Sequence, residues 1–213
     1  MRYSILLAVT LTCFAANPAS AQYTSSRGAE INPYIWGVPK GWTTGGNAEL
    51  RYGTVIGGIP GGKRAALLLQ ARGMAENDFG TLMQSISADA YLGRRVRLSA
   101  MVSADSNLAA NRIALWMRVN DASGKVAAID DMETRSIPAG QGWQRQEVVL
   151  DVPNGAASIT FGILLTGSPK GHCCGIVKVS DFNLDIVGND VPTTAPPLES
   201  LPRSPVNLDF SQL

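Results

Sequence analysis

The sequence predicts an all-β protein: an antiparallel β-sandwich of the jelly-roll type, followed by an extended, proline-rich C-terminal tail. Within residues 94–152, three segments alternate apolar and polar residues with period two. Such alternation places one face of a sheet in a core and leaves the other free to meet solvent or a ligand. The chain contains 22 glycines and 12 prolines, and these punctuate it at the short intervals that are typical of sandwiches and jelly rolls. No segment carries a convincing helical pattern.

The first residues predict an exported protein. Met1 and Arg2 precede an apolar run over 5–16, and residues 18–21 read PASA, which ends in an Ala-x-Ala pattern. This is the pattern of a secretory signal peptide, which we assign to residues 1–21. The apolar run is too short to span a membrane. We therefore expect the mature protein in the periplasm or outside the cell.

The first half of the domain contains six expected strands. An irregular, aromatic strand over 33–44 is followed by strands at 49–56, 65–71, 79–86, 95–104 and 113–120. The last two share an aliphatic face made of Val96, Leu98, Ala100, Val102, Ile113, Leu115, Met117 and Val119. Their opposite face carries Arg97, Met101, Trp116 and Arg118.

The second half begins with a hairpin turn, NDASG at 120–124, which leads into a strand over 126–132. Another alternating strand follows at 144–152. Residues 158–166 are apolar on both faces, which places them at the centre of a sheet, and 175–187 form the last strand. From residue 188 the prolines predict an extended tail, 188–213, because proline cannot sit in a central strand. Its end either frays or docks Leu208 and Phe210 on an open sheet edge.

Composition excludes several classes of function. Residues 22–187 suffice for one domain with a substantial core. The formal net charge of +1 predicts no attraction to nucleic acid or anionic lipid. His172 is the only histidine, which excludes multi-histidine metal sites and leaves a single candidate base for a nucleophile. We expect no metal, no cofactor and no enzymatic activity.

An ordered series of motifs runs through residues 31–187. It consists of GTLMQ at 80–84, YLGRRVRLSA at 91–100, LWMRV at 115–119, DDM at 130–132, Arg135, Ile137, Trp143, VLDVP at 149–153 and FGILL at 161–165. The series resembles a bacterial jelly-roll domain of the galactose-binding-like type, similar in shape to many carbohydrate-binding modules. The family it resembles is found in exported proteins and attached to transcription regulators. The resemblance implies a β-sandwich with a binding role.

The chain departs from this family at two places. Asp131 stands where an asparagine is usual, and residues 177–181 read VKVSD where an aromatic residue and paired aspartates are expected. Related jelly rolls hold a structural calcium with an acidic residue on that strand. Asp181 is the one such residue present here, so no calcium site is assigned.

The residues expected to bind a ligand surround Trp116. A tryptophan on the open face of a sheet can stack on a sugar ring, and Arg118 and Arg97 would supply planar, directional donors to hydroxyls or a carboxylate. The alternative is that a loop covers Trp116 and makes it part of the core.

A second cluster follows the strand over 126–132. Asp130, Asp131 and Glu133 could bind calcium or act as an acid/base pair. The alternative is an Asp–Arg ion pair that fixes the loop. We expect Asp130 and Arg135, with Trp143 across the next loop, to shape the rim of the ligand site.

The segment GHCCG at 171–175 leaves three outcomes open. In an oxidising compartment Cys173 and Cys174 should be oxidised, either with each other or with another molecule. They can also be inert thiols, or act together with His172 as a soft metal site or as a catalytic nucleophile and its base. Adjacent cysteines are only ~3.8 Å apart at Cα, below the usual disulfide range, so a ring between them would be strained.

These observations predict an exported, non-catalytic binding module for a saccharide or envelope glycan. The alternative is a structural or protein-interaction component of the cell envelope that uses the tail and Cys173–Cys174 to hold a partner protein.

Overall fold

The computed structural model describes residues 34–195, with the exception of 49, 57–63, 71–72 and 170–173. The expected signal peptide and the end of the tail, including Leu208 and Phe210, lie outside the described residues. Within these ranges no helix has the length and apolarity needed to cross a membrane.

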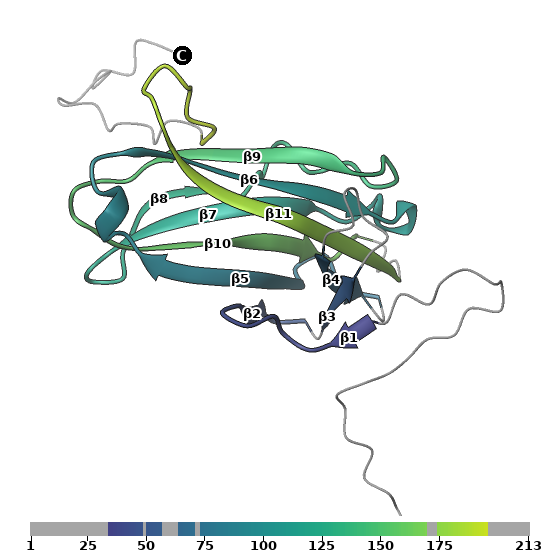
Figure 1. Ribbon diagram of the computed structural model, residues 1–213. Coiled ribbons are helices and arrows are strands. Elements are labelled where there is room, and N and C mark those ends of the chain that lie inside the picture. The colour runs from purple at the N-terminus through teal and green to yellow at the C-terminus, as the bar shows by residue number, and fades with distance from the viewer. Residues whose placement is uncertain (1–33, 49, 57–63, 71–72, 170–173, 196–213) are drawn as a thin grey trace, which may run out of the picture.

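The described chain folds into two antiparallel sheets packed face to face (Figure 1). The six-stranded sheet has the spatial order β1 (Tyr34–Trp36), β3 (Arg51–Ile56), β4 (Arg64–Gln70), β11 (Gly175–Val187), β6 (Arg95–Ala104) and β9 (Gln144–Asp151). The five-stranded sheet has the order β2 (Thr43–Gly46), β5 (Phe79–Ser87), β10 (Ala156–Thr166), β7 (Ile113–Asp121) and β8 (Val126–Asp130). Two 3-10 turns, η2 (Asp89–Tyr91) and η3 (Ser106–Leu108), interrupt the loops. The predicted all-β sandwich is confirmed.

The core forms between the two sheets from the aliphatic rows that alternation predicted. The six-stranded sheet contributes Val96, Leu98, Ala100, Val102, Val148, Leu150, Val177 and Val179. The five-stranded sheet contributes Leu82, Ile113, Leu115, Met117, Val119, Ile159, Ile163 and Leu165. The prediction that residues 158–166 lie centrally is confirmed, since β10 pairs with β5 on one side and β7 on the other.

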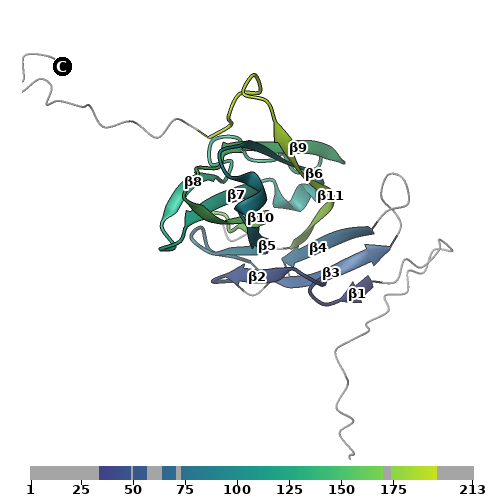
Figure 2. The same ribbon diagram turned by 60° about the vertical axis from the view of Figure 1, so that its left-hand side comes forward.

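The sandwich has two sides on which the sheet edges face each other, and a loop joins the edges on each side. The expected first strand over 33–44 is divided into β1, an edge of the six-stranded sheet, and β2, an edge of the five-stranded sheet, so residues 37–42 bridge the sheets. On the other side, residues 131–143 connect the edges β8 and β9. Figure 2 shows β1 to β4 gathered along the first side, away from β8 and β9.

The start of the tail is held against the second side. Arg95 donates two hydrogen bonds to the Asp151 carboxylate, at 2.7 and 3.0 Å, and two more to the carbonyls of Asn189 and Val191. The backbone N–H of Thr194 donates to the Val149 carbonyl at 3.0 Å, and the Val149 N–H donates to Thr194 Oγ1 at 2.7 Å. Residues 188–195 thus cover part of the free edge of β9, which protects it from pairing with another chain.

Acid should weaken the interactions of two carboxylates, Asp151 beside the tail and Asp121 in the β7–β8 turn. The hydrogen bond from Arg95 lowers the pKa of Asp151 below its ordinary value of 3.8. The Ser123 hydroxyl, with backbone N–H groups, likewise lowers the pKa of Asp121 in the β7–β8 turn. Because both pKa values are lower in the folded state, the stabilisation is present above about pH 4 and is lost as the pH falls through the folded pKa values.

We expect the urea midpoint to fall between pH 5 and pH 2, and the difference between wild type and Asp151→Asn to shrink over the same interval. The effect should be modest because the Asp151 side chain is 60% exposed. A difference between the two proteins that stays constant from pH 7 to pH 2 would contradict this assignment.

Candidate functional site

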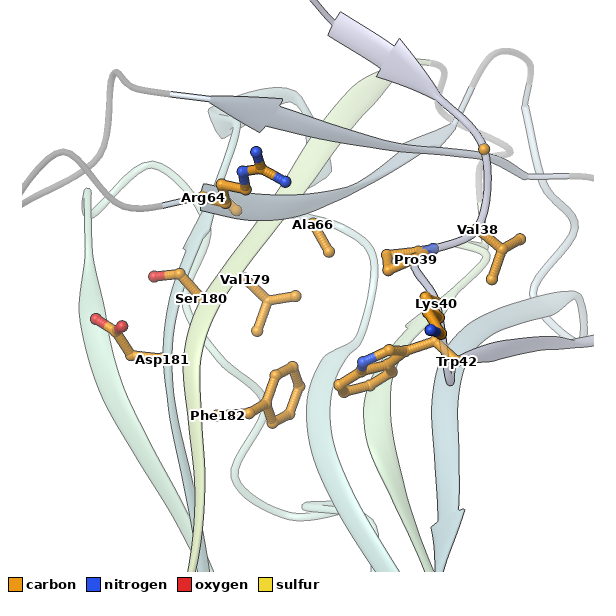
Figure 3. A pocket seen from close by; sticks show the side chains of 12 residues that line it. Val38, Pro39, Lys40, Trp42, Arg64, Ala66, Val179, Ser180, Asp181 and Phe182 are labelled. Carbon is orange, nitrogen blue, oxygen red and sulfur yellow. The ribbon is translucent and has the colours of Figure 1, made fainter. Parts of the chain in front are cut away.

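A cavity of about 600 Å³ opens on the side of the sandwich that residues 37–42 bridge (Figure 3). Three segments of the described chain line it: the β1–β2 loop, the start of β4 and the middle of β11. Its apolar part is made by Pro39, Trp42, Ala66, Val179 and Phe182, and its polar groups are Lys40, Arg64, Ser180 and Asp181. The volume lies within the roughly 300–1,000 Å³ of small-molecule sites, which combine an apolar lining with a few polar groups.

Trp42 is held in place by two phenylalanines from the core. Its ring centroid lies 4.8 Å from that of Phe182 in a tilted arrangement and 6.0 Å from that of Phe161 in an edge-to-face arrangement. Phe161 comes from the inner face of β10 and Phe182 from β11, so the indole closes the gap between the two sheets. Trp42 stays half-buried, and Figure 3 shows its ring beside Phe182 at the cavity. The cavity therefore has a rigid aromatic surface fixed before any ligand arrives.

The turn before Trp42 is fixed to β5. The Trp42 N–H donates to the Pro39 carbonyl at 3.0 Å, and Gln84 Nε2 donates to the Gly41 carbonyl at 3.0 Å. Gly41 has a φ of +83°, a conformation that L side chains rarely adopt, and a Cβ there would lie 3.2 Å from Gln84 Nε2. Glycine at 41 is thus what allows the chain to turn and present Trp42.

A β-bulge in β11 places Phe182 and Asp181. Val177 and Val179 point into the core, so unbroken alternation would turn Asp181 inward as well. Instead the pairing with β6 shifts between Ser180 and Asn183, and Asp181 takes up a left-handed φ of +53°. The extra residue leaves Asp181 exposed at the cavity and turns Phe182 toward Trp42. Bulges of this kind re-aim side chains and are frequent near functional sites.

Substitutions at Asp181 should therefore separate backbone from side-chain effects. Aspartate and asparagine tolerate left-handed φ values, whereas a β-branched residue does not. We expect Asp181→Asn to leave the urea midpoint nearly unchanged and Asp181→Val to lower stability by about 1–3 kcal/mol. Near-ultraviolet circular dichroism should then show a disturbed Trp42–Phe182 contact in the valine variant only. Equal stability of the two variants would show that the bulge does not depend on residue 181.

Of the two positions that the sequence leaves open for Trp116, the structure supports the one in the core and contradicts the one that is open to a ligand. Its side chain is only 9% exposed and belongs to the hydrophobic core cluster. Its Nε1–H donates to Thr81 Oγ1 on β5 at 2.9 Å, so the indole crosses the intervening strand β10. Ala114, on the same side of β7, is also fully buried. The alternation along β7 correctly placed Trp116 on the side opposite the aliphatic row. It could not show that this side is buried as well.

Arg118 and Arg97 do not share a site. Arg118 is half-buried on the outside of the five-stranded sheet, where its Nε donates to Asn120 Oδ1 at 3.0 Å. Arg97 lies on the outside of the six-stranded sheet, with its Nη2 3.6 Å from Asp185 Oδ2. The two outer faces point away from each other across a core about 10 Å thick. The expectation that both arginines capture one ligand beside Trp116 is therefore wrong.

Asp130 and Arg135 form the expected ion pair on the second side of the sandwich. The Asp130 carboxylate is buried, and it accepts hydrogen bonds from the Arg135 guanidinium, the Met132 N–H and the Thr194 hydroxyl. Arg135 also donates to the Glu147 carbonyl at 3.1 Å. This network joins the loop to β9 and to the tail. It lies far from the cavity, so a role in shaping a ligand rim is not supported there.

The remaining predicted residues lie elsewhere. Trp143 is half-buried against Ala65, Leu67 and Ile176, on the outside of the six-stranded sheet. Cys174 is disulfide-bonded, whereas His172 and Cys173 lie outside the described residues. Among the residues that the structure describes, no three His, Cys, Asp or Glu side chains gather as metal ligands.

Sequence reasoning missed Trp42 and Phe182, although a signal for each was present. Trp42 lies in the aromatic, turn-rich segment over 33–44, which was interpreted only as an irregular strand. In β11 the apolar positions change parity, from 177 and 179 to 182, 184 and 186. Such a change of parity inside one strand indicates a bulge, because one extra residue exchanges the two faces.

Comparisons with known proteins agree with the fold. No protein-family model matches the sequence. The chain is 32% identical over 176 residues to the HTH-type transcriptional regulator YbfP of Bacillus subtilis (strain 168), an alignment that covers 81% of this chain and 57% of that protein. The chain therefore spans little more than half the length of this relative.

Among solved structures, the family 22 carbohydrate-binding module of Clostridium thermocellum Xyn10B superposes with a TM-score of 0.51 at 12% identity, over 71% of this chain and 90% of the module. The CBM22-1 xylan-binding domain of Paenibacillus barcinonensis Xyn10C gives 0.50 at 15% identity, over 71% of this chain and 88% of the domain. At such low identity the likeness shows the fold alone. The chain thus has the β-sandwich fold of carbohydrate-binding modules.

Proposed function

We propose that this protein is an exported, non-catalytic saccharide-binding module whose ligand site is the cavity beside Trp42. The observation that carries the proposal is the pairing of a fixed, half-buried tryptophan with polar and charged groups around an open cavity of about 600 Å³. A sugar ring presents an apolar face of C–H groups and a periphery of hydroxyls. The ring can pack on an indole while side-chain donors and acceptors bind its hydroxyls.

Three further considerations support the proposal. The neighbours in fold are carbohydrate-binding modules, one of which is named for xylan binding. Among the described residues, a single carboxylate, that of Asp181, lines the cavity, whereas glycoside hydrolysis ordinarily uses a pair. The expected signal peptide supports export to a compartment in which glycans are present.

Isothermal titration against a panel of oligosaccharides, xylotetraose included, tests the proposal. We expect Trp42→Ala to raise the Kd at least tenfold, a loss of about 1.4 kcal/mol. Ala66→Phe, which adds a ring to the cavity wall and removes no donor, should weaken binding by a similar factor.

Phe79→Ala is the matched control, because Phe79 is a partly exposed aromatic residue on β5 that does not line the cavity. It should bind as the wild type does. Absence of binding to every member of the panel would refute the proposal, as would undiminished binding by both cavity variants.

The alternative is an envelope component that holds a partner through its tail and cysteines; because Cys174 is already disulfide-bonded within the chain, the tail is the part that would hold such a partner. Truncation tests it only if residues 188–195 are kept, because Thr194 and the carbonyls that Arg95 binds belong to the folded domain. A chain ending at Ala195 should lose a tail-held partner yet retain saccharide binding.

A further inference from the structure

Among the described residues that line the cavity, two charged side chains, Lys40 and Arg64, are cationic and one, Asp181, is anionic. Lys40 and Arg64 are exposed, and neither has an ion-pair partner within the part of the chain that the structure describes. Five other arginines, Arg95, Arg97, Arg112, Arg135 and Arg145, each lie beside a carboxylate. Arg94 and Arg118, like Arg64, have no ion-pair partner among the described residues, but they do not line a cavity with an aromatic surface.

The two cations come from different elements and flank the aromatic surface. Lys40 belongs to the β1–β2 loop and Arg64 to the start of β4, and Figure 3 shows them on opposite sides of the cavity. A ring packed between them on Trp42 would present its substituents to one cation or the other. A guanidinium binds a carboxylate through two parallel N–H bonds, whereas an ammonium acts as a compact positive charge.

We propose that the cavity prefers acidic saccharides, with the carboxylate of a uronic acid bound by Arg64 and supported by the charge of Lys40. This inference rests on the proposed saccharide-binding function and specifies its ligand class. Two cations at the rim of an apolar surface attract an anionic ligand more than a neutral one of the same shape, and their exposure to solvent makes this attraction sensitive to salt.

A matched pair of oligosaccharides tests the preference: xylotetraose, and xylotetraose that carries one glucuronic acid. At about 20 mM NaCl we expect the acidic member to bind at least tenfold more tightly than the neutral one. The advantage should decrease as salt is raised, because added ions screen charges that are open to solvent.

Arg64→Gln should reduce the advantage to threefold or less, because glutamine keeps a hydrogen-bond donor for hydroxyls but loses the charge that favours the acidic member. Lys40→Gln should reduce it by a smaller factor. Arg94→Gln is the control, because it removes the same charge from an exposed arginine that does not line the cavity; it should leave the advantage intact.

The outcomes separate the two proposals. Equal binding of both members by the wild type, with loss of binding in Trp42→Ala, overturns the preference and leaves the saccharide site standing. An advantage that survives in Arg64→Gln also overturns the preference. Failure of both members to bind overturns the preference together with the proposed function.

Discussion

Trp116→Ala should destabilise the protein by about 3–5 kcal/mol, which is the usual cost of truncating a large buried aromatic side chain. The indole is part of the core cluster, so its removal leaves a cavity that the surrounding strands can fill only in part. It also removes the donor to Thr81 Oγ1, whose own hydroxyl is already committed to the Ile163 carbonyl at 2.8 Å.

Urea unfolding monitored by circular dichroism measures this effect. Trp116→Phe serves as the matched control, because it keeps most of the apolar contact and loses mainly the hydrogen bond; we expect a cost of about 1–2 kcal/mol. Saccharide affinity, measured well below the unfolding transition, should be unchanged in the phenylalanine variant. If Trp116→Ala were as stable as the wild type but unable to bind saccharide, Trp116 would be a ligand-binding residue and not a core residue.

Arg135→Met should cost about 3 kcal/mol, because it leaves the buried Asp130 carboxylate without its cation. Breaking a buried ion pair from one side is far more costly than its net contribution would suggest, since an uncompensated charge remains. The Asp130 side chain is 4% exposed and that of Arg135 is 34% exposed, so the loss should fall at the low end of the range for fully buried pairs.

A double-mutant cycle isolates this effect. Asp130→Asn combined with Arg135→Met should recover part of the stability that Arg135→Met alone loses, because the unpaired charge is gone. Thr194→Val, which removes the third partner and loosens residues 188–195, should cost less than Arg135→Met. A free energy of unfolding of Arg135→Met within about 0.5 kcal/mol of the wild-type value would show that the network does not stabilise this side of the sandwich.

The strands could be predicted from sequence because period-two alternation is visible in a short stretch of residues. Packing against a second sheet stabilises a strand that has such a pattern. β6 and β9 follow this pattern with aliphatic rows inside and mainly polar rows outside. β7 shows the limit of such reasoning: both its rows are buried, and nothing local to the sequence states that the outer row is covered. Trp116 was misplaced for this reason.

The cavity could not be predicted in the same way, because it joins segments near residues 40, 65 and 180. The bulge in β11 decides its shape, and a single extra residue there exchanges Asp181 and Phe182 between the two faces. The Asp130–Arg135 pair was predictable because its members are close in sequence. The contact between Asp130 and Thr194 could not be predicted. The sequence of the tail contains no pattern that determines where the tail packs.

Amide and indole NMR spectra recorded during a saccharide titration identify the residues that contact the ligand, and so test whether the cavity beside Trp42 is the binding site. The chain has four tryptophans, Trp36, Trp42, Trp116 and Trp143, so the indole N–H signals are few enough to assign by substitution. We predict that the Trp42 signal shifts most, together with backbone amides around Lys40, Ala66 and Asp181, while the Trp116 signal stays in place. Shifts concentrated at Trp116 and Arg118, with Trp42 unchanged, would place the ligand on the outside of the five-stranded sheet and exclude the cavity as the binding site.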